Sequence, residues 1–236
     1  GSVEIEGSTF SGNTAHTSDG GALFLDDRTR TSRITNSTFS GNLSASRGAI
    51  TLHVGAVTIV NSTIVHNTNT AGGWSVGVST GWYGPAEVFL SNTIVAGNTS
   101  GGVAADLYFD PNSPIGARLV SLGHNVIGSN LYVPGVFTQS GDQAGTMTQP
   151  LDPGLLALAD NGGPTWTHAL RPASPALDAG STATPGTDDA CMATDQRGLP
   201  RPGSGTAACD IGAFEHQITF PLSLHVGMGG SVAGLF

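Results

Sequence analysis

The chain has 236 residues, of which 17 are acidic and 8 are arginine, and it contains no lysine. A net charge of −9 without clustered cations argues against binding to nucleic acid or anionic lipid, and the missing lysine excludes lysine-based catalysis. The 35 glycines and the charged fraction of 11% favour short strands and tight turns over helices. No run of about 18 apolar residues predicts a transmembrane segment.

A six-residue motif recurs along the first half of the chain. Its copies are Ser8–Asn13, Ser37–Asn42, Ser62–Asn67 and, with one residue inserted, Asn92–Asn98. The spacing of roughly 25 to 30 residues indicates one supersecondary unit that stacks on copies of itself. Each period also holds two further short strand patterns, such as Leu23–Leu25 and Arg33–Thr35. Three strands in a period without a helix predict an all-β fold, a right-handed parallel β-helix.

Stacking of the periods predicts ladders of like residues. The apolar ladders expected to point inward are Ile5, Ile34, Ile59 and Phe89, and Phe10, Phe39, Ile64 and Ile94. The motif asparagines, which we expect at one turn with a structural role, are Asn13, Asn42, Asn67 and Asn98. The Asn-x-Ser/Thr sequons at residues 36, 42, 61 and 98 are expected by-products of this repeat, and His66 is expected as an exposed turn residue.

The sequence divides into three parts. Residues 1–127 are expected to form regular coils, residues 128–216 irregular coils that close the solenoid, and residues 217–236 the start of an appended module or anchor. Because the chain begins in mid-repeat, an open coil at this end predicts self-association with another subunit. Cys191 and Cys209 favour one disulfide in an exported protein over two free buried thiols.

Several motifs resemble known families. The alternation of Phe-x-x-Asn (10–13, 39–42) with Gly-Gly-Ala-Leu (20–23) and Arg-Gly-Ala-Ile (47–50) resembles repeats of chlamydial polymorphic membrane proteins. The C-terminal half resembles the choice-of-anchor Q family through 122–128, 158–165, 167–170, 174–180, 195–198 and 209–215. This resemblance implies an exported bacterial β-helix protein on the cell surface, with Cys191 and Cys209 as its disulfide. It implies no reaction, although pectate-lyase-like enzymes share the fold.

One outward column of polar residues could carry chemistry. If Leu25, Leu52, Val78 and Phe109 point inward, the next column holds Asp26, His53, Ser79 and Asp110. The candidate catalytic residues are therefore Asp26, His53, Asp110 and Arg28, for acid/base work on a uronate. Asp26 and Asp27 are the candidate ligands of a Ca²⁺ ion, and no other cofactor is expected. The alternative is that these aspartates only form a turn.

Aromatic side chains on outward loops suggest contact with sugar rings. The candidate glycan-binding residues are Trp74, Trp82, Tyr83 and Tyr108, and the alternative is that Trp74 caps the core under the other rings. The sequence thus predicts a secreted, structural or adhesin-like surface module that contacts a polysaccharide or cell-surface glycan. A polysaccharide lyase or glycoside hydrolase is the first alternative, and a self-assembling surface or filament subunit is the second.

Overall fold

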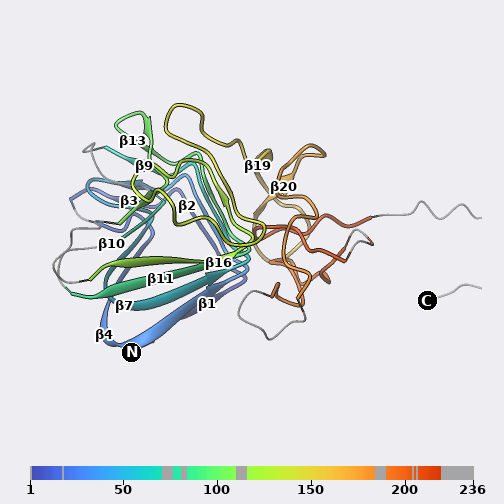
Figure 1. The fold of residues 1–236 in the computed structure, drawn as a ribbon, viewed down its shortest axis with the longest axis horizontal. Coiled ribbons are helices and arrows are strands. Elements are labelled where there is room, and N and C mark those ends of the chain that lie inside the picture. The colour runs from blue at the N-terminus through green and yellow to red at the C-terminus, as the bar shows by residue number, and fades with distance from the viewer. Residues whose placement is uncertain are drawn as a thin grey trace, which may run out of the picture.

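The computed structural model describes residues 2–17, 19–70, 77–80, 84–109, 116–183, 190–203, 205 and 207–218, with only the backbone of residues 27–30. These residues form strands and turns, and the strands stack in parallel as a right-handed β-helix around a triangular core (Figure 1). The fold class predicted from the repeat is confirmed. Among the described residues, no helix has the length and apolar character needed to cross a membrane.

Three parallel sheets form the walls of the solenoid. The seven-stranded sheet contains β1 (Glu4–Glu6), β4 (Leu23–Thr35), β7 (Ile50–Val60), β10 (Val78–Thr80), β11 (Ala86–Ser91), β15 (Leu107–Tyr108) and β16 (Arg118–Gly123). The six-stranded sheet contains β2 (Thr9–Ser11), β5 (Thr38–Ser40), β8 (Thr63–Val65), β12 (Ile94–Ala96), β17 (Val126–Ile127) and β18 (Gln143–Ala144). The five-stranded sheet contains β3 (Thr14–Ala15), β6 (Leu43–Ser44), β9 (Thr68–Asn69), β13 (Thr99–Ser100) and, antiparallel to β13, β14 (Val103–Ala104).

The apolar ladders point into the core, but their fourth members differ from the prediction. Leu90, not Phe89, pairs with Ile59, and Val95, not Ile94, pairs with Ile64. The fourth copy of the motif is therefore residues 93–98 without an insertion, because Ile94 pairs with Thr63. The prediction aligns the fourth period one residue out of register, and such a shift exchanges the inner and outer faces of a strand. It therefore places Phe89 and Ile94 inside instead of Leu90 and Val95.

The motif asparagines form a continuous hydrogen-bonded ladder inside the stack. Each amide Nδ2 donates to the Oδ1 of the next coil, with distances of 2.9 Å from Asn13 to Asn42, 2.8 Å from Asn42 to Asn67 and 2.7 Å from Asn67 to Asn98. Each Oδ1 also accepts the backbone N–H of the asparagine in the previous coil. The structural role predicted for these asparagines is confirmed.

Asp106 ends this ladder. Its Oδ1 accepts both the backbone N–H and the side-chain amide of Asn98, and its Oδ2 accepts the N–H of Ser129 at 2.7 Å. Although these donors favour the carboxylate, burial dominates and raises the pKa of Asp106 to about 7. Asp106 thus satisfies the last donors of the ladder at the cost of burying a carboxyl group.

A second ladder runs along the corner between the seven-stranded and six-stranded sheets. Here each hydroxyl or amide oxygen accepts the backbone N–H of the previous coil, in the order Ser37, Ser62, Thr93, Asn125 and Asp142. The preceding residues at this corner, Asn36, Asn61 and Asn92, have left-handed backbone with φ of 45°, 45° and 49°. Asparagine tolerates this conformation better than most residues, so the Asn-Ser/Thr pair defines the corner.

Residues beyond 128 close the solenoid over part of their length only. Val133, Val136 and Phe137, in the segment that links β17 to β18, pack on the solenoid core. Residues 151–218, which we call the lateral segment, instead lie beside the solenoid (Figure 1). This segment includes the antiparallel strands β19 (Leu155–Ala159) and β20 (Thr167–Leu170).

The lateral segment binds the corner of every coil. Asn36 donates to the carbonyl of Thr194 at 2.9 Å, and Asn61 and Asn92 accept the N–H groups of Met192 and Ser181 at 2.8 Å each. At the two ends, Thr165 donates to the carbonyl of Gly7, and Gln143 donates to the carbonyl of Pro175. The sequon residues Asn36 and Asn61 are therefore buried contacts of the fold.

A second apolar core lies under the lateral segment. The outer face of the six-stranded sheet is polar at Ser11 and Ser40 but apolar at the equivalent Val65 and Ala96. The residues that form this core are Val65, Ile94, Ala96, Val126, Leu155, Leu170, Ala176, Ile211 and Phe214. The exchange of serine for apolar residues on this face explains why the segment docks here.

Buried ion pairs and a disulfide fix the lateral segment internally. Arg201 and Glu215 form a salt bridge of 2.9 Å with side chains 1% and 0% exposed, and Asp195 pairs with Arg197 at 2.7 Å. Cys191 and Cys209 form the predicted disulfide. Removal of one partner from a buried ion pair leaves an uncompensated charge, so these contacts specify one arrangement of an otherwise irregular chain.

We expect Asn67→Ala to destabilise the protein by about 3 kcal/mol, because it leaves ladder partners in both neighbouring coils unpaired. Asn13→Ala is the matched control, since Asn13 lies at the exposed end of the same ladder and should cost well under half as much. Urea unfolding of both variants measures the difference. Equal losses would contradict an energetic role for the internal ladder.

We expect Asp106 to make stability depend on pH. Its pKa rises from 3.8 in the unfolded chain to about 7 in the fold, so its contribution is complete below pH 3.8 and is lost as the pH rises to about 7. In Asp106→Asn, the unfolding free energy relative to the unmodified protein should therefore improve between pH 4 and pH 8, by roughly 4 kcal/mol at most. Parallel pH profiles for the two proteins would refute this assignment.

Candidate functional site

The column of catalytic candidates has a different register from the one predicted. Val78 pairs with Ile50 rather than Leu52, and Ser79 pairs with Thr51 and Tyr108. A register shift in β4 pairs Asp26 with Val54, so Asp26 is an exposed residue that does not pair with His53. Asp110 and the side chains of Asp27 and Arg28 lie outside the described residues. Within the described part of the chain, no three His, Cys, Asp or Glu residues group as metal ligands, and the Ca²⁺ site stays a prediction.

His53 has a different acidic partner, Asp19. His53 Nε2 lies 3.1 Å from Asp19 Oδ2, which also binds Arg47 at 2.9 Å, and the Phe24 ring packs against His53 at 4.4 Å between centroids. Burial raises the pKa of Asp19, but hydrogen bonds from Ser46 and His53 and the charge of Arg47 outweigh it and lower the pKa. The sequence contained a signal for this cluster, because Asp19 and Arg47 occupy nearly equivalent positions in successive periods.

The glycan candidates are described in part. Trp74, Trp82 and Tyr83 lie outside the described residues. Tyr108 is 9% exposed, and its ring packs edge-on against Tyr132 at 5.3 Å, so little of that ring is free for a ligand. The exposed aromatic side chains that the described chain offers include Trp166, which directly precedes β20 and is 56% exposed.

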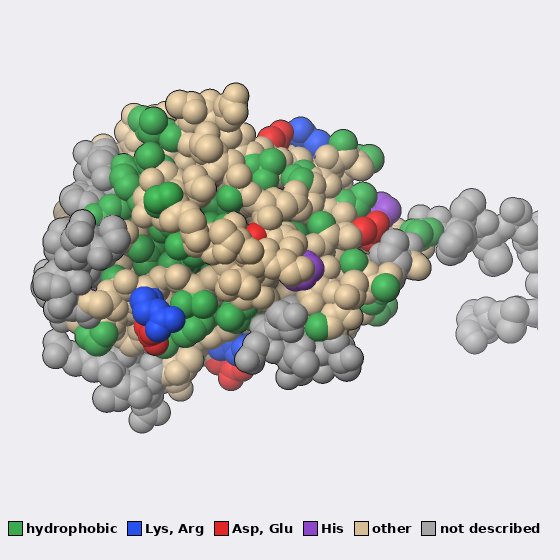
Figure 2. Space-filling view, in the orientation of Figure 1, with side chains coloured by type: hydrophobic (Ala, Val, Ile, Leu, Met, Phe, Trp, Pro, Cys, Tyr) green, Lys and Arg blue, Asp and Glu red, His purple; other side chains and the backbone are tan. Residues whose placement is uncertain are grey.

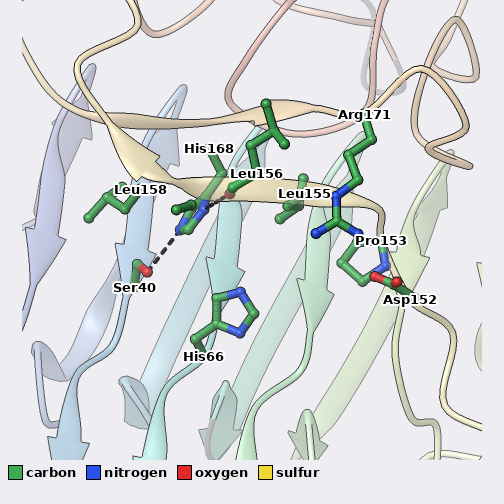
Figure 3. A pocket seen from close by; sticks show the side chains of 10 residues that line it. Ser40, His66, Asp152, Pro153, Leu155, Leu156, Leu158, His168 and Arg171 are labelled. Carbon is green, nitrogen blue, oxygen red and sulfur yellow. Dashed lines mark hydrogen bonds between the residues drawn. The ribbon is translucent and has the colours of Figure 1, made fainter.

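A pocket of about 520 Å³ opens where the lateral segment crosses the six-stranded sheet (Figure 3). Its walls come from β5 and the following coil on one side and from the β19–β20 region on the other. The residues that line it include Ser40, His66, Asp152, Leu155, Leu156, Leu158, His168 and Arg171. The pocket lies at the point where the outer face of the sheet changes from serine to valine, so the lateral segment covers the apolar coils and leaves a hollow beside Ser40.

Ser40 and His168 form a hydrogen-bonded pair in this pocket. His168 Nε2 lies 2.9 Å from Ser40 Oγ, and His168 Nδ1 lies 2.7 Å from the carbonyl oxygen of Leu156. A carbonyl can only accept, so Nδ1 carries the proton of the neutral ring and Nε2 carries the lone pair. Ser40 must therefore donate its hydroxyl proton to His168. Burial lowers the pKa of His168, which keeps the ring neutral near pH 7.

His66 lies at the rim of the pocket in an unfavourable backbone conformation. Its φ is 58°, and the equivalent positions in the other three copies of the motif are Gly12, Gly41 and Gly97 with φ of 65°, 64° and 67°. His66 is exposed, as predicted, and its ring lies 5.6 Å from that of His168. A residue with a Cβ costs about 1 kcal/mol or more in this conformation, so the imidazole occupies a place where glycine is more stable.

The opposite end of the pocket holds charged groups of both signs. Arg171 and Asp152 lie there, and Figure 3 shows the Arg171 side chain reaching toward Asp152 and Pro153. Burial lowers the pKa of His66, and the charge of Asp152 opposes this shift. The pocket therefore combines a serine bound to a neutral imidazole, a second imidazole, an arginine and an apolar wall of leucines.

Sequence reasoning missed this pocket because its two walls are far apart in the chain. Ser40 and His168 are separated by 128 positions, and nothing local to either residue predicts the other. The available signal was His66, which interrupts a series of glycines at one turn of the repeat. Comparison of the chain with protein-family models, curated proteins and solved structures finds no match.

We expect His66→Gly to raise the pKa of His168, because the charge of His66 is one of the causes that lower it. The variant should fold at least as stably as the unmodified protein, since glycine suits the left-handed backbone at this position. An NMR titration of the imidazole resonances measures the pKa, and urea unfolding measures the stability. Asp152→Asn is the control, and it should lower the pKa of His66 further. A His168 titration that is the same in His66→Gly would contradict coupling between the rings.

Proposed function

We propose that this chain is the structural, adhesin-like body of an exported surface protein that contacts glycans through outward loops. The observation that carries the proposal is the lateral segment, which binds the stack from Gly7 in the first coil to Gln143 at the last. Coils of a solenoid contact only their neighbours, so a segment that ties all of them braces the stack against bending and fraying. A braced body suits a module that holds a binding surface away from its anchor.

The disulfide supports an exported location. Cys191–Cys209 joins two parts of the lateral segment, and Asn61 of the solenoid donates to Cys191 Sγ at 3.7 Å. Disulfides persist in oxidising compartments and are rare in the cytosol. The resemblance of residues 122–215 to the choice-of-anchor Q family points to the same location, on a bacterial cell surface.

The surface chemistry supports an uncharged or weakly charged partner. Figure 2 shows a face of uncharged polar and apolar atoms on which charged side chains form small, separate groups. Glycans present hydroxyl groups and flat apolar ring faces, which bind to neutral polar surfaces and to exposed aromatic rings. Trp166 offers such a ring beside the first coil, where its carbonyl accepts a hydrogen bond from Thr9.

Affinity electrophoresis through gels that contain neutral or acidic polysaccharides, with and without Ca²⁺, tests this function. We expect retardation by at least one polysaccharide, a loss of affinity of about 3- to 10-fold in Trp166→Ala, and no new reducing or unsaturated ends. Leu199→Ala, which removes another exposed apolar side chain of the lateral segment, is the matched control.

Two results would refute the proposal. Cleavage of the polysaccharide that is lost in Asp26→Ala or His53→Ala would make the protein a polysaccharide lyase or hydrolase. Migration that no polysaccharide changes would remove glycan contact, and a mass that grows with concentration in the same buffer would then favour a self-assembling subunit.

A further inference from the structure

We propose that Ser40 and His168 are the nucleophile and general base of an esterase site that hydrolyses short-chain carboxylic esters in the pocket beside β5. The inference is independent of glycan contact, since it rests on the pocket alone. It starts from the direction of one hydrogen bond: the Leu156 carbonyl fixes the tautomer of His168, so Ser40 donates to Nε2 at 2.9 Å. Activation of a serine requires this direction and this distance.

The third group of the arrangement is a backbone carbonyl. In serine hydrolases a carboxylate orients the histidine and stabilises its protonated form. Here the Leu156 carbonyl orients His168 through a 2.7 Å bond and favours its protonated form, although burial has the larger and opposite effect on the pKa. The site should therefore be a modest catalyst whose base is already mostly deprotonated at pH 6.5.

His66 is the second observation that points to a ligand. Glycine occupies its position in the other three copies of the motif, and the histidine is kept there in left-handed backbone on the rim of the pocket. Strained residues of this kind occur preferentially at functional sites. Figure 3 shows the His66 ring on the same side of the pocket as the Ser40–His168 pair. We assign His66 as the N–H donor to the oxyanion that forms during attack.

The remaining lining indicates the class of substrate. Leu155, Leu156 and Leu158 supply an apolar wall that suits a short acyl chain, and Arg171 supplies a cation at the far end. The volume of about 520 Å³ accommodates a small ester but not a folded partner.

The reaction then proceeds in two balanced steps. Ser40 Oγ bonds to the ester carbonyl carbon while its proton moves to His168 Nε2. The bond from that carbon to the alcohol oxygen breaks, and His168 returns the proton to the departing alcohol. In the second step water attacks the acyl-Ser40 ester, its proton passes to His168 and then to Ser40 Oγ, and the free carboxylic acid leaves.

Labelling with a fluorophosphonate probe, followed by peptide mass mapping, and hydrolysis of p-nitrophenyl butyrate test the proposal. We expect the probe on Ser40 and a rate that falls on the order of 100-fold or more in Ser40→Ala and His168→Gln. Ser11→Ala is the matched control, because Ser11 pairs with Ser40 one coil earlier and should keep the full rate. His66→Gly, which we expect to fold well, should lower the rate while Ser40 stays labelled.

The pH dependence of the hydrolysis rate distinguishes a catalytic role of Ser40 and His168 from a purely structural hydrogen bond between them. The rate should rise with pH and reach half its plateau below pH 6.5, because burial lowers the pKa of His168. Mass mapping of the unmodified protein decides the matter even if Ser40→Ala unfolds. An unlabelled Ser40, a label on another residue, or equal rates for Ser40→Ala and Ser11→Ala would overturn the proposal and leave the pair as a structural hydrogen bond.

Discussion

The ladder of asparagine amides is the interaction on which the rest of the structure depends. Each amide donates to the next coil and accepts from the previous one, so the coils stack at one register and the turn after the motif repeats in place. The ladder has a direction and must end at an acceptor. Asp106 fills this role, and its pKa of about 7 shows that the end of the ladder is a compromise between hydrogen bonding and burial.

The corner asparagines connect the solenoid to the lateral segment. Their left-handed backbone turns the chain between two sheets, and their amides reach outward to bind Thr194, Met192 and Ser181. One residue type thus performs two tasks, because asparagine combines tolerance of positive φ with a donor and an acceptor. The segment then covers the coils whose outer faces are apolar and leaves a pocket where the outer face is Ser40.

The two proposals draw on different parts of the same architecture. The contacts of the lateral segment with the coils support a rigid surface body. The pocket, in contrast, lies at the interface between the lateral segment and the six-stranded sheet. A binding or catalytic site at such an interface is held by two rigid elements, and this arrangement positions side chains best. His66 agrees with this view, because it replaces a more stable glycine at the turn beside the pocket.

The sequence by itself determined the repeat, the parallel β-helix, the ladder of Asn13, Asn42, Asn67 and Asn98, and the cysteine pair. These features are local or periodic, so they can be recognised from neighbouring residues or from the same residue types at equivalent positions of successive coils. The tertiary structure alone decided the register of the fourth coil, the partner of His53, the docking of the lateral segment and the pairing of Ser40 with His168. These depend on contacts between residues with no periodic relation, such as the 128 positions between Ser40 and His168, and on packing that a single strand pattern does not encode.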